Sequence, residues 1–290
     1  MAWHGTLALD YRRDEVHNAP RTVVRDRHDG PLRVLASLYP EAPGICHNVL
    51  VHPPGGLVSG DRLDIDATLG PGSHALITTP GATRFYRSTG ATATQHLRAT
   101  LAEGARLEWL PLEAIAYSGC LAENLMRFEL APGAEMIGWD VLALGLPASN
   151  QGFELGRYRQ SIELPGRWLE RGLLDAADTR LLDSPLGWDG LRVMGTLWFA
   201  TGSTFTPERR EALLDAARAV IDAGAGNDAF AASGLRPTFA GATAVHEGVV
   251  VLRALGPRVE PVMALLARVW AAWRHTGWQL ATCTPRVWRT

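Results

Sequence analysis

The sequence contains no lysine and carries almost no net charge. Its 28 basic residues are all arginine, and against 30 acidic residues they leave a formal net charge of −2. Proteins that bind a phosphate backbone need a broad basic surface, so this balance argues against nucleic acid as a partner. The absence of lysine excludes no function by itself, because arginine can take every solvated basic position.

Cysteines and long apolar runs are also scarce. The three cysteines, Cys46, Cys120 and Cys283, have no paired spacing, so they suggest neither a thiolate metal motif nor a disulfide framework. This pattern favours a reducing, cytoplasmic location. No apolar run approaches the roughly 20 residues that cross a bilayer, and the first residues lack the basic start and apolar stretch of a secretory signal.

The motifs of several enzyme classes are missing. The loop Gly-x-x-x-x-Gly-Lys-Ser/Thr that cradles phosphates is absent, as are the Gly-x-Ser-x-Gly elbow and the His-Glu-x-x-His helix. The glycine-rich segment 52–61 ends on Asp61, whose charge would repel a phosphate, so we interpret it as a specified turn. No histidine is close in sequence to activate the thiol of Cys120.

From residue 2 to about residue 204 the sequence has the rhythm of an all-β protein. Segments rich in β-branched, aromatic and other apolar residues are interrupted by Gly, Pro, Asp or Asn, at intervals of roughly 8 to 12 residues. No repeat of a solenoid period is visible. The predicted strands include 22–27, 45–52, 62–69, 74–79, 92–101, 106–110, 125–130, 136–144 and 192–200.

Two helices are predicted near the end of the sequence. The first has Thr206 as its N-cap, Pro207 in its first position and Gly224 at its exit. The second covers 261–276, where apolar residues recur on one helical face. A strand-like stretch over 244–253 separates them.

These elements predict a mainly β fold, in which layered multi-stranded sheets carry a small C-terminal two-helix element. We expect a single domain over 1–290, β-rich in 1–204 and with a helix-strand-helix region in 205–290.

Acidic residues in apolar surroundings are the strongest candidates for function. Burying an ionised carboxylate without a partner costs several kcal/mol, so such residues call for an explanation. Each one could simply accept hydrogen bonds or pair with an arginine such as Arg84. As a group they could line a water-filled passage for a divalent cation, because oxygen ligands bind such ions without trapping them as thiolates do. The candidates are Asp61, Glu108, Glu113 and Asp140.

Histidine is a further candidate for metal contact. His47 and His52 point to opposite faces of one extended strand, and Cys46 would lie about 20 Å from His52, so these residues cannot chelate one ion from that strand. Ordinary hydrogen-bonded histidines are the simpler interpretation, and a transient contact through His52 stays open. An alternative function is a small-molecule hydrolase or transferase with a pocket around His52, Asp61 and Glu113.

Several motifs stand in an order that closely resembles the UreD/UreH family of urease accessory proteins, over almost the whole length. These motifs are residues 30–32, 39–41, Cys46-His47, 52–61, 76–88, 107–113, 138–140 and 285–288.

The resemblance implies a non-catalytic protein that binds UreF, through UreF the GTPase UreG, and apo-urease, in a hetero-oligomer away from membranes. It also implies that transient Ni²⁺, rather than a tightly bound cofactor, moves through an internal water-filled passage. A pure adaptor with no metal role is a further alternative. The candidates for the passage are Asp61, Glu108, Glu113, Asp140, Glu154 and His52. The candidates for partner contact are Trp270, Trp273, Arg286 and Trp288.

The sequence departs from the family pattern at three places. Arg84 stands where a lysine is usual, and Ser118 replaces a usual carboxylate. The segment 145–151, with Leu146 and Gln151, lacks an arginine and a glutamate of the pattern. These changes predict either that nickel transit relies on the remaining acidic groups or that the partners differ.

Overall fold

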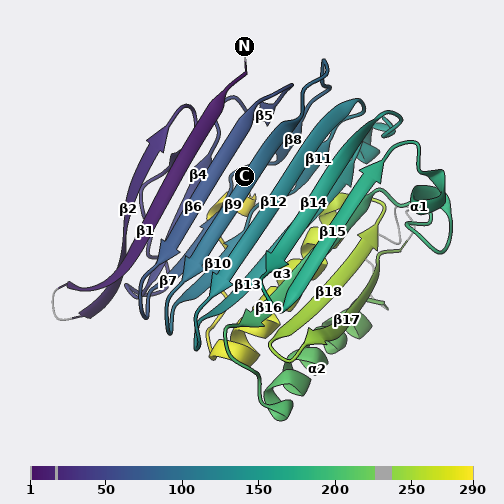
Figure 1. Cartoon of the computed structure of the whole chain (residues 1–290). Helices are drawn as coiled ribbons and strands as arrows, with labels where there is room; N and C mark the ends of the chain where they lie inside the picture. Colours follow the sequence, from purple (N-terminus) through teal and green to yellow (C-terminus); the bar gives the residue numbers. More distant parts are fainter. Residues whose placement is uncertain (1, 17–18, 226–236, 290) are drawn as a thin grey trace.

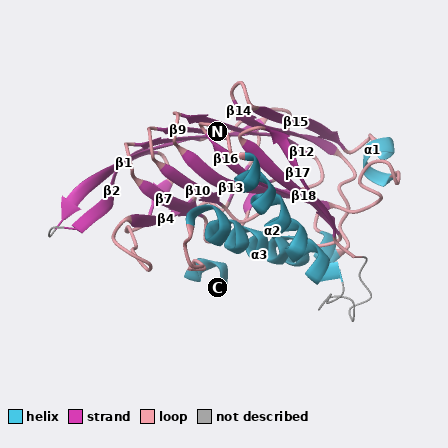
Figure 2. Ribbon diagram, turned by 90° about the horizontal axis from the view of Figure 1, so that it is seen from below, coloured by secondary structure: helices cyan, strands magenta, loops and turns pink. Residues whose placement is uncertain are grey.

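The computed structural model describes residues 2–16, 19–225 and 237–289, which form three layers. Two β-sheets are stacked face to face, and two long helices cover the outer face of one of them (Figure 2). Among the described residues, no helix combines the length and the apolar character needed to cross a membrane.

The first layer is a seven-stranded sheet with the order β15-β14-β12-β9-β6-β1-β2 (Figure 1). Its inner strands β1, β6, β9, β12 and β14 are parallel to one another, and β2 and β15 add antiparallel edges. The strands are β1 (His4–Val16), β2 (Ala19–Asp29), β6 (Arg62–Leu69), β9 (Ala93–Leu101), β12 (Cys120–Leu130), β14 (Gly156–Leu164) and β15 (Trp168–Asp175).

The second layer is an eleven-stranded sheet whose main path is β17-β18-β16-β13-β10-β7-β4-β3. Three short strands, β5, β8 and β11, pair in parallel beside this path and join it at β13. The strands are β3 (Arg33–Val34), β4 (Ile45–Val51), β5 (Gly56–Leu57), β7 (His74–Thr78), β8 (Thr83–Phe85), β10 (Arg106–Leu110), β11 (Ala114–Ala116), β13 (Glu135–Leu144), β16 (Val193–Thr201), β17 (Phe239–His246) and β18 (Val249–Gly256).

The chain alternates between the two sheets, and the same tight turn carries it across three times. Gly72, Gly104 and Gly133 have φ of 64°, 67° and 77°, a left-handed conformation that favours glycine. These glycines are separated by 32 and 29 residues. The backbone N–H of Gly72 donates to the carbonyl of Glu103 (3.1 Å), which joins the first turn to the second. The middle of the chain therefore repeats one turn in space, although no repeat of a solenoid period is visible in the sequence.

Helices form the third layer. Helix α2 (Pro207–Ala225) begins as predicted, because Thr206 Oγ1 accepts a hydrogen bond from the backbone N–H of Arg209 (3.2 Å). Helix α3 (Val259–Trp278) packs on β13, β16 and β18. The minor helical elements are η1 (Pro147–Ser149), α1 (Thr179–Asp183) and η3 (Arg286–Arg289).

Two hydrophobic cores result, and β13 contributes to both. All ten residues of β13 are buried. Met136 and Leu142 face the seven-stranded sheet, whereas Ile137 and Val141 face the helices. This alternation follows from the two-residue period of a strand that is covered on both sides.

The predicted fold class is confirmed, since the described chain is mainly strands in layered sheets with two long helices near its end. One element was predicted wrongly. The stretch 244–253 covers the end of β17, a turn at Glu247-Gly248 and the first part of the antiparallel strand β18. The single-domain organisation stays a prediction, and its limiting residues 1 and 290 lie outside the described part.

Candidate functional site

Asp140 lies between the two sheets, where it contacts residues of β12 and β14. Its side chain points from β13 towards the seven-stranded sheet and is 5% exposed. Asn124 Nδ2 on β12 donates to Oδ1 (3.2 Å), and Gln160 Nε2 on β14 donates to Oδ2. No described arginine or histidine forms an ion pair with it. Burial disfavours the charged form and raises the pKa of Asp140 to about 6.

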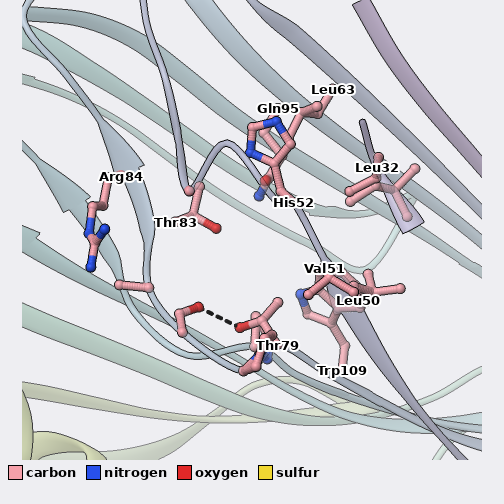
Figure 3. A pocket seen from close by; sticks show the side chains of 16 residues that line it. Leu32, Leu50, Val51, His52, Leu63, Thr79, Thr83, Arg84, Gln95 and Trp109 are labelled. Carbon is pink, nitrogen blue, oxygen red and sulfur yellow. Dashed lines mark hydrogen bonds between the residues drawn. The ribbon is translucent and has the colours of Figure 1, made fainter. Parts of the chain in front are cut away.

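A cavity of about 240 Å³ is lined by residues of β4, β8 and β10 from the eleven-stranded sheet and of β6 and β9 from the seven-stranded sheet (Figure 3). His52, Thr83, Arg84, Gln95 and Trp109 are among its lining side chains. Gln95 Nε2 donates to Asn124 Oδ1 (3.3 Å), and Asn124 in turn donates to Asp140. A chain of two amides, the first partly buried and the second buried, therefore joins the cavity wall to the buried carboxyl.

His52 lies at the start of the glycine-rich turn, where Gly55 N–H donates to the His52 carbonyl (2.8 Å). Partial burial lowers the pKa of His52, and the negative charge of Asp61 opposes this shift. The imidazole is therefore biased towards its neutral form, which is the form that binds metal ions.

Asp61 closes the same turn. Its carboxylate accepts hydrogen bonds from the backbone N–H groups of Val58 and Trp3, both at 2.9 Å. The residue is 4% exposed, so the two bonds satisfy a buried charge and fix the turn against the N-terminal strand. This arrangement matches the simpler interpretation given above for buried acidic residues.

Glu108 lies on the opposite face of the eleven-stranded sheet from Asp140, under helix α3. It is fully buried, hydrogen-bonds His74 Nε2 (2.9 Å) and Trp270 Nε1 (2.6 Å), and forms an ion pair with Arg274, whose Nε lies at 3.2 Å. Arg274 donates a hydrogen bond from Nη2 to Glu41 (2.7 Å). Glu108 therefore belongs to a buried network that ties α3 to the sheet.

Glu113 and Glu154 lie elsewhere. Glu113 lines a separate hollow of about 650 Å³ beside the start of α3. Burial raises the pKa of Glu113, with a further contribution from the charge of Glu260 and an opposing one from Arg84. Glu154 is exposed, and its backbone N–H donates to Ser118 Oγ (3.2 Å).

The structure thus brings only part of the predicted set together. No three His, Cys, Asp or Glu side chains of the described residues are grouped as a metal site. His52 and Glu113 line different cavities, so the pocket expected for a hydrolase or transferase is not assembled. Whether any candidate contacts Ni²⁺ stays a prediction.

The amide residues around Asp140 were not predicted. Asn124 and Gln160 occupy inward positions in strands whose other inward residues, such as Met126 and Ile162, are apolar. The sequence does contain a signal for them, because each is a polar residue at a strand position where the alternating pattern predicts a buried apolar one.

Two of the predicted partner contacts are corrected by their burial. Trp270 and Trp273 are 1% and 0% exposed, and they pack α3 against the sheet and against α2, so no partner can reach them in this conformation. Trp288 is partly buried, donates from Nε1 to Thr78 Oγ1 (2.8 Å), and packs against Trp139. Arg286 is exposed and stays a prediction.

Comparison with known proteins agrees with the resemblance found in the sequence. The model of the family described as UreD urease accessory protein matches residues 4–289. A protein of Leptothrix cholodnii named urease accessory protein UreD is 60% identical over 290 residues, covering 100% of both chains. Proteins of the same name from Paracidovorax citrulli and Variovorax paradoxus are 61% and 60% identical over 99% and 100% of both chains. The chain therefore belongs to the UreD family of urease accessory proteins.

Proposed function

We propose that this chain serves urease maturation as a non-catalytic scaffold that binds apo-urease and UreF, and through UreF the GTPase UreG, while passing Ni²⁺ towards the urease active site. Membership of the UreD family supports the role in urease maturation. The partners, the nickel step and the location in the cytoplasm are the proposed parts.

One observation carries the nickel step: the fold holds Asp140 between its two sheets with no cationic partner among the described residues. An ionised carboxylate in such a place is costly, and the two amide donors compensate for only part of its lost hydration. A divalent cation would supply the missing positive charge, and carboxylate oxygens suit a borderline ion that must be released again.

The surroundings of Asp140 also support a polar route. His52 provides an imidazole at the cavity, and the amides of Gln95 and Asn124 lead from the cavity to Asp140. Trp109 Nε1, also at the cavity, is buried without a hydrogen-bond partner in the described protein. Such groups favour solvent-filled over dry packing.

The proposed passage is smaller than the set predicted from the sequence. It includes Asp140 and His52, whereas the carboxylates of Asp61 and Glu108 are held by other groups of the chain.

The test is activation of urease in cells that carry the urease subunits, the other accessory proteins and either the wild-type chain or Asp140→Asn. We expect nickel per urease and urease activity to fall by about tenfold or more with Asp140→Asn, because the passage loses its central charge. Co-purification with UreF and with apo-urease is expected to persist. Asp222→Asn, an exposed position on α2, is the matched control and should behave as wild type.

His52→Gln provides a second variant, should Asp140→Asn fold poorly. Full nickel loading of urease with both variants would contradict the nickel step and favour a pure adaptor without a metal role. Failure of the wild-type chain to bind UreF or apo-urease would refute the scaffold role itself.

A further inference from the structure

The outer face of the seven-stranded sheet carries a hollow of about 450 Å³ that is rich in arginine. It lies over β9, β12, β14 and β15, which are neighbours in the sheet (Figure 1). We call it the basic hollow; Arg98, Arg127, Arg159 and Arg171 surround Leu125 and Ser161 in it, and Glu163 is the acidic residue of its lining.

Strand register brings these arginines together from distant parts of the sequence. Arg98 on β9 is directly opposite Arg127 on β12. Ser161 on β14 is opposite both Leu125 on β12 and Arg171 on β15. Like charges in directly opposed positions destabilise a sheet, so stability alone does not favour this arrangement.

Two of the four guanidinium groups have no acidic partner. Arg127 pairs with Glu129 and Glu163, both at 2.9 Å, and Arg159 pairs with Glu123 at 3.5 Å. Arg98 and Arg171 form no ion pair within the described ranges of the chain, although Asp66 is the register neighbour of Arg98. The lining therefore carries four arginines against one acidic residue, Glu163, and two of the guanidinium groups remain available to a ligand.

Apolar side chains border the same hollow. Leu169 and Leu173 on the edge strand β15 are each 49% exposed, and they are opposite Glu163 and Arg159. Arginine beside exposed apolar surface is typical of protein interfaces. A site for a small anion would not require exposed leucines beside the arginines.

The spacing also favours an extended ligand. Arg98 and Arg171 are three strand steps apart across the sheet and two residues apart along it, which is about 16 Å at roughly 4.8 Å per step and 3.3 Å per residue. One carboxylate or phosphate is too small to contact both. A peptide segment with acidic residues at alternate positions presents a charge about every 6.6 Å and can reach both while its apolar residues contact the leucines.

We propose that the basic hollow docks an acidic segment of a partner protein, with carboxylates on Arg98 and Arg171 and apolar side chains on Leu169 and Leu173. This surface is on the opposite side of the molecule from the helices, and the proposed nickel route does not use it.

The test measures fluorescence anisotropy of a labelled heptapeptide of alternating glutamate and leucine, titrated with the purified chain at low salt. We expect binding that weakens as salt rises, because exposed charges are screened. The double variant Arg98→Gln with Arg171→Gln should raise the Kd at least tenfold, and Leu169→Ser with Leu173→Ser should raise it several-fold. The matched control is Arg25→Gln, an exposed arginine on β2 at the far end of the same sheet, and it should bind as wild type.

A variant with reversed charge distinguishes loss of the site from misfolding, because a misfolded chain would not gain a new affinity. Arg98→Glu with Arg171→Glu should lose the glutamate peptide and gain affinity for a peptide of alternating lysine and leucine. An unchanged Kd for the double glutamine variant would overturn the proposal. So would displacement of the peptide by millimolar inorganic phosphate together with unchanged binding by the leucine variant, because these results would indicate a small-anion site.

Discussion

The buried carboxyl of Asp140 should leave a signature in the pH dependence of stability. Burial raises its pKa from 3.8 to about 6. Between these pH values the unfolded chain has lost the proton and the folded chain still holds it, so the free energy of unfolding falls as pH rises through this window. At 1.36 kcal/mol per pKa unit, the fall amounts to about 3 kcal/mol. Asp140→Asn should lack it, as measured by urea unfolding at pH 4, 5, 6 and 7.

The comparison between the two proteins isolates this one group. Glu41 and Asp64 have lowered pKa values and give the opposite slope, but they do so equally in wild type and variant. Asp222→Asn should keep the wild-type slope, since that residue is exposed. Parallel curves for wild type and Asp140→Asn would contradict a raised pKa at this position.

Single residues were predictable from the sequence only where their own neighbours determine their surroundings. Asp140 was singled out because the residues around it are apolar on both faces, and it is buried. Glu108 was singled out by the same argument, yet its partners are His74, Trp270 and Arg274, which are 34 to 166 residues away in sequence. No local pattern reports which distant donor will reach a buried carboxylate, so its structural role became visible only in the fold.

At the scale of elements, the repeated turn makes a specific demand on glycine. Gly104 has a φ of 67°, and an added Cβ would meet only backbone atoms of Gly72 at 3.8 and 3.9 Å. The cost of Gly104→Ala is therefore backbone strain rather than a clash, and we expect a loss of about 1 to 2 kcal/mol in the free energy of unfolding. Chemical denaturation measures it.

The matched control is Gly44→Ala, at a glycine without positive φ where an added Cβ has no atom within 4 Å. That change should cost under about 0.5 kcal/mol. Equal losses at Gly44 and Gly104 would show that the left-handed turn is not what requires glycine.

Strand and helix positions were largely predictable, whereas their grouping was not. The predictions for 62–69 and 106–110 coincide with β6 and β10. Strand β12 begins at Cys120 rather than at residue 125. The hairpin of β17 and β18 was not predicted. The apolar residues of Val249–Gly256 follow those at the end of β17 after a turn of only two residues, so the two strands were predicted as one. The turn repeat was not predicted because its shared pattern is short, a leucine (Leu69, Leu101 or Leu130) three residues before the turn glycine, and because it recurs at unequal spacing.

At the scale of the whole molecule, the shared sheet determines how the protein should unfold. Strand β13 gives Met136 to the core between the sheets and Ile137 to the core under the helices, so a core that opened alone would expose one face of a strand whose other face is still packed. We therefore expect calorimetry to show one transition, with a van't Hoff enthalpy equal to the calorimetric enthalpy, as in a single cooperative domain.

Variants in the two cores test whether the chain unfolds in a single transition. Met126→Ala weakens the core between the sheets, and Leu266→Ala weakens the core under the helices; each should cost about 2 to 5 kcal/mol, because both side chains are buried. Both variants should lower the Tm of the same single transition. Two transitions, each shifted by only one variant, would instead divide the chain into a double-sheet unit and a helical unit. That result would contradict the single-domain prediction, because β13 could then keep one face packed while the other is exposed.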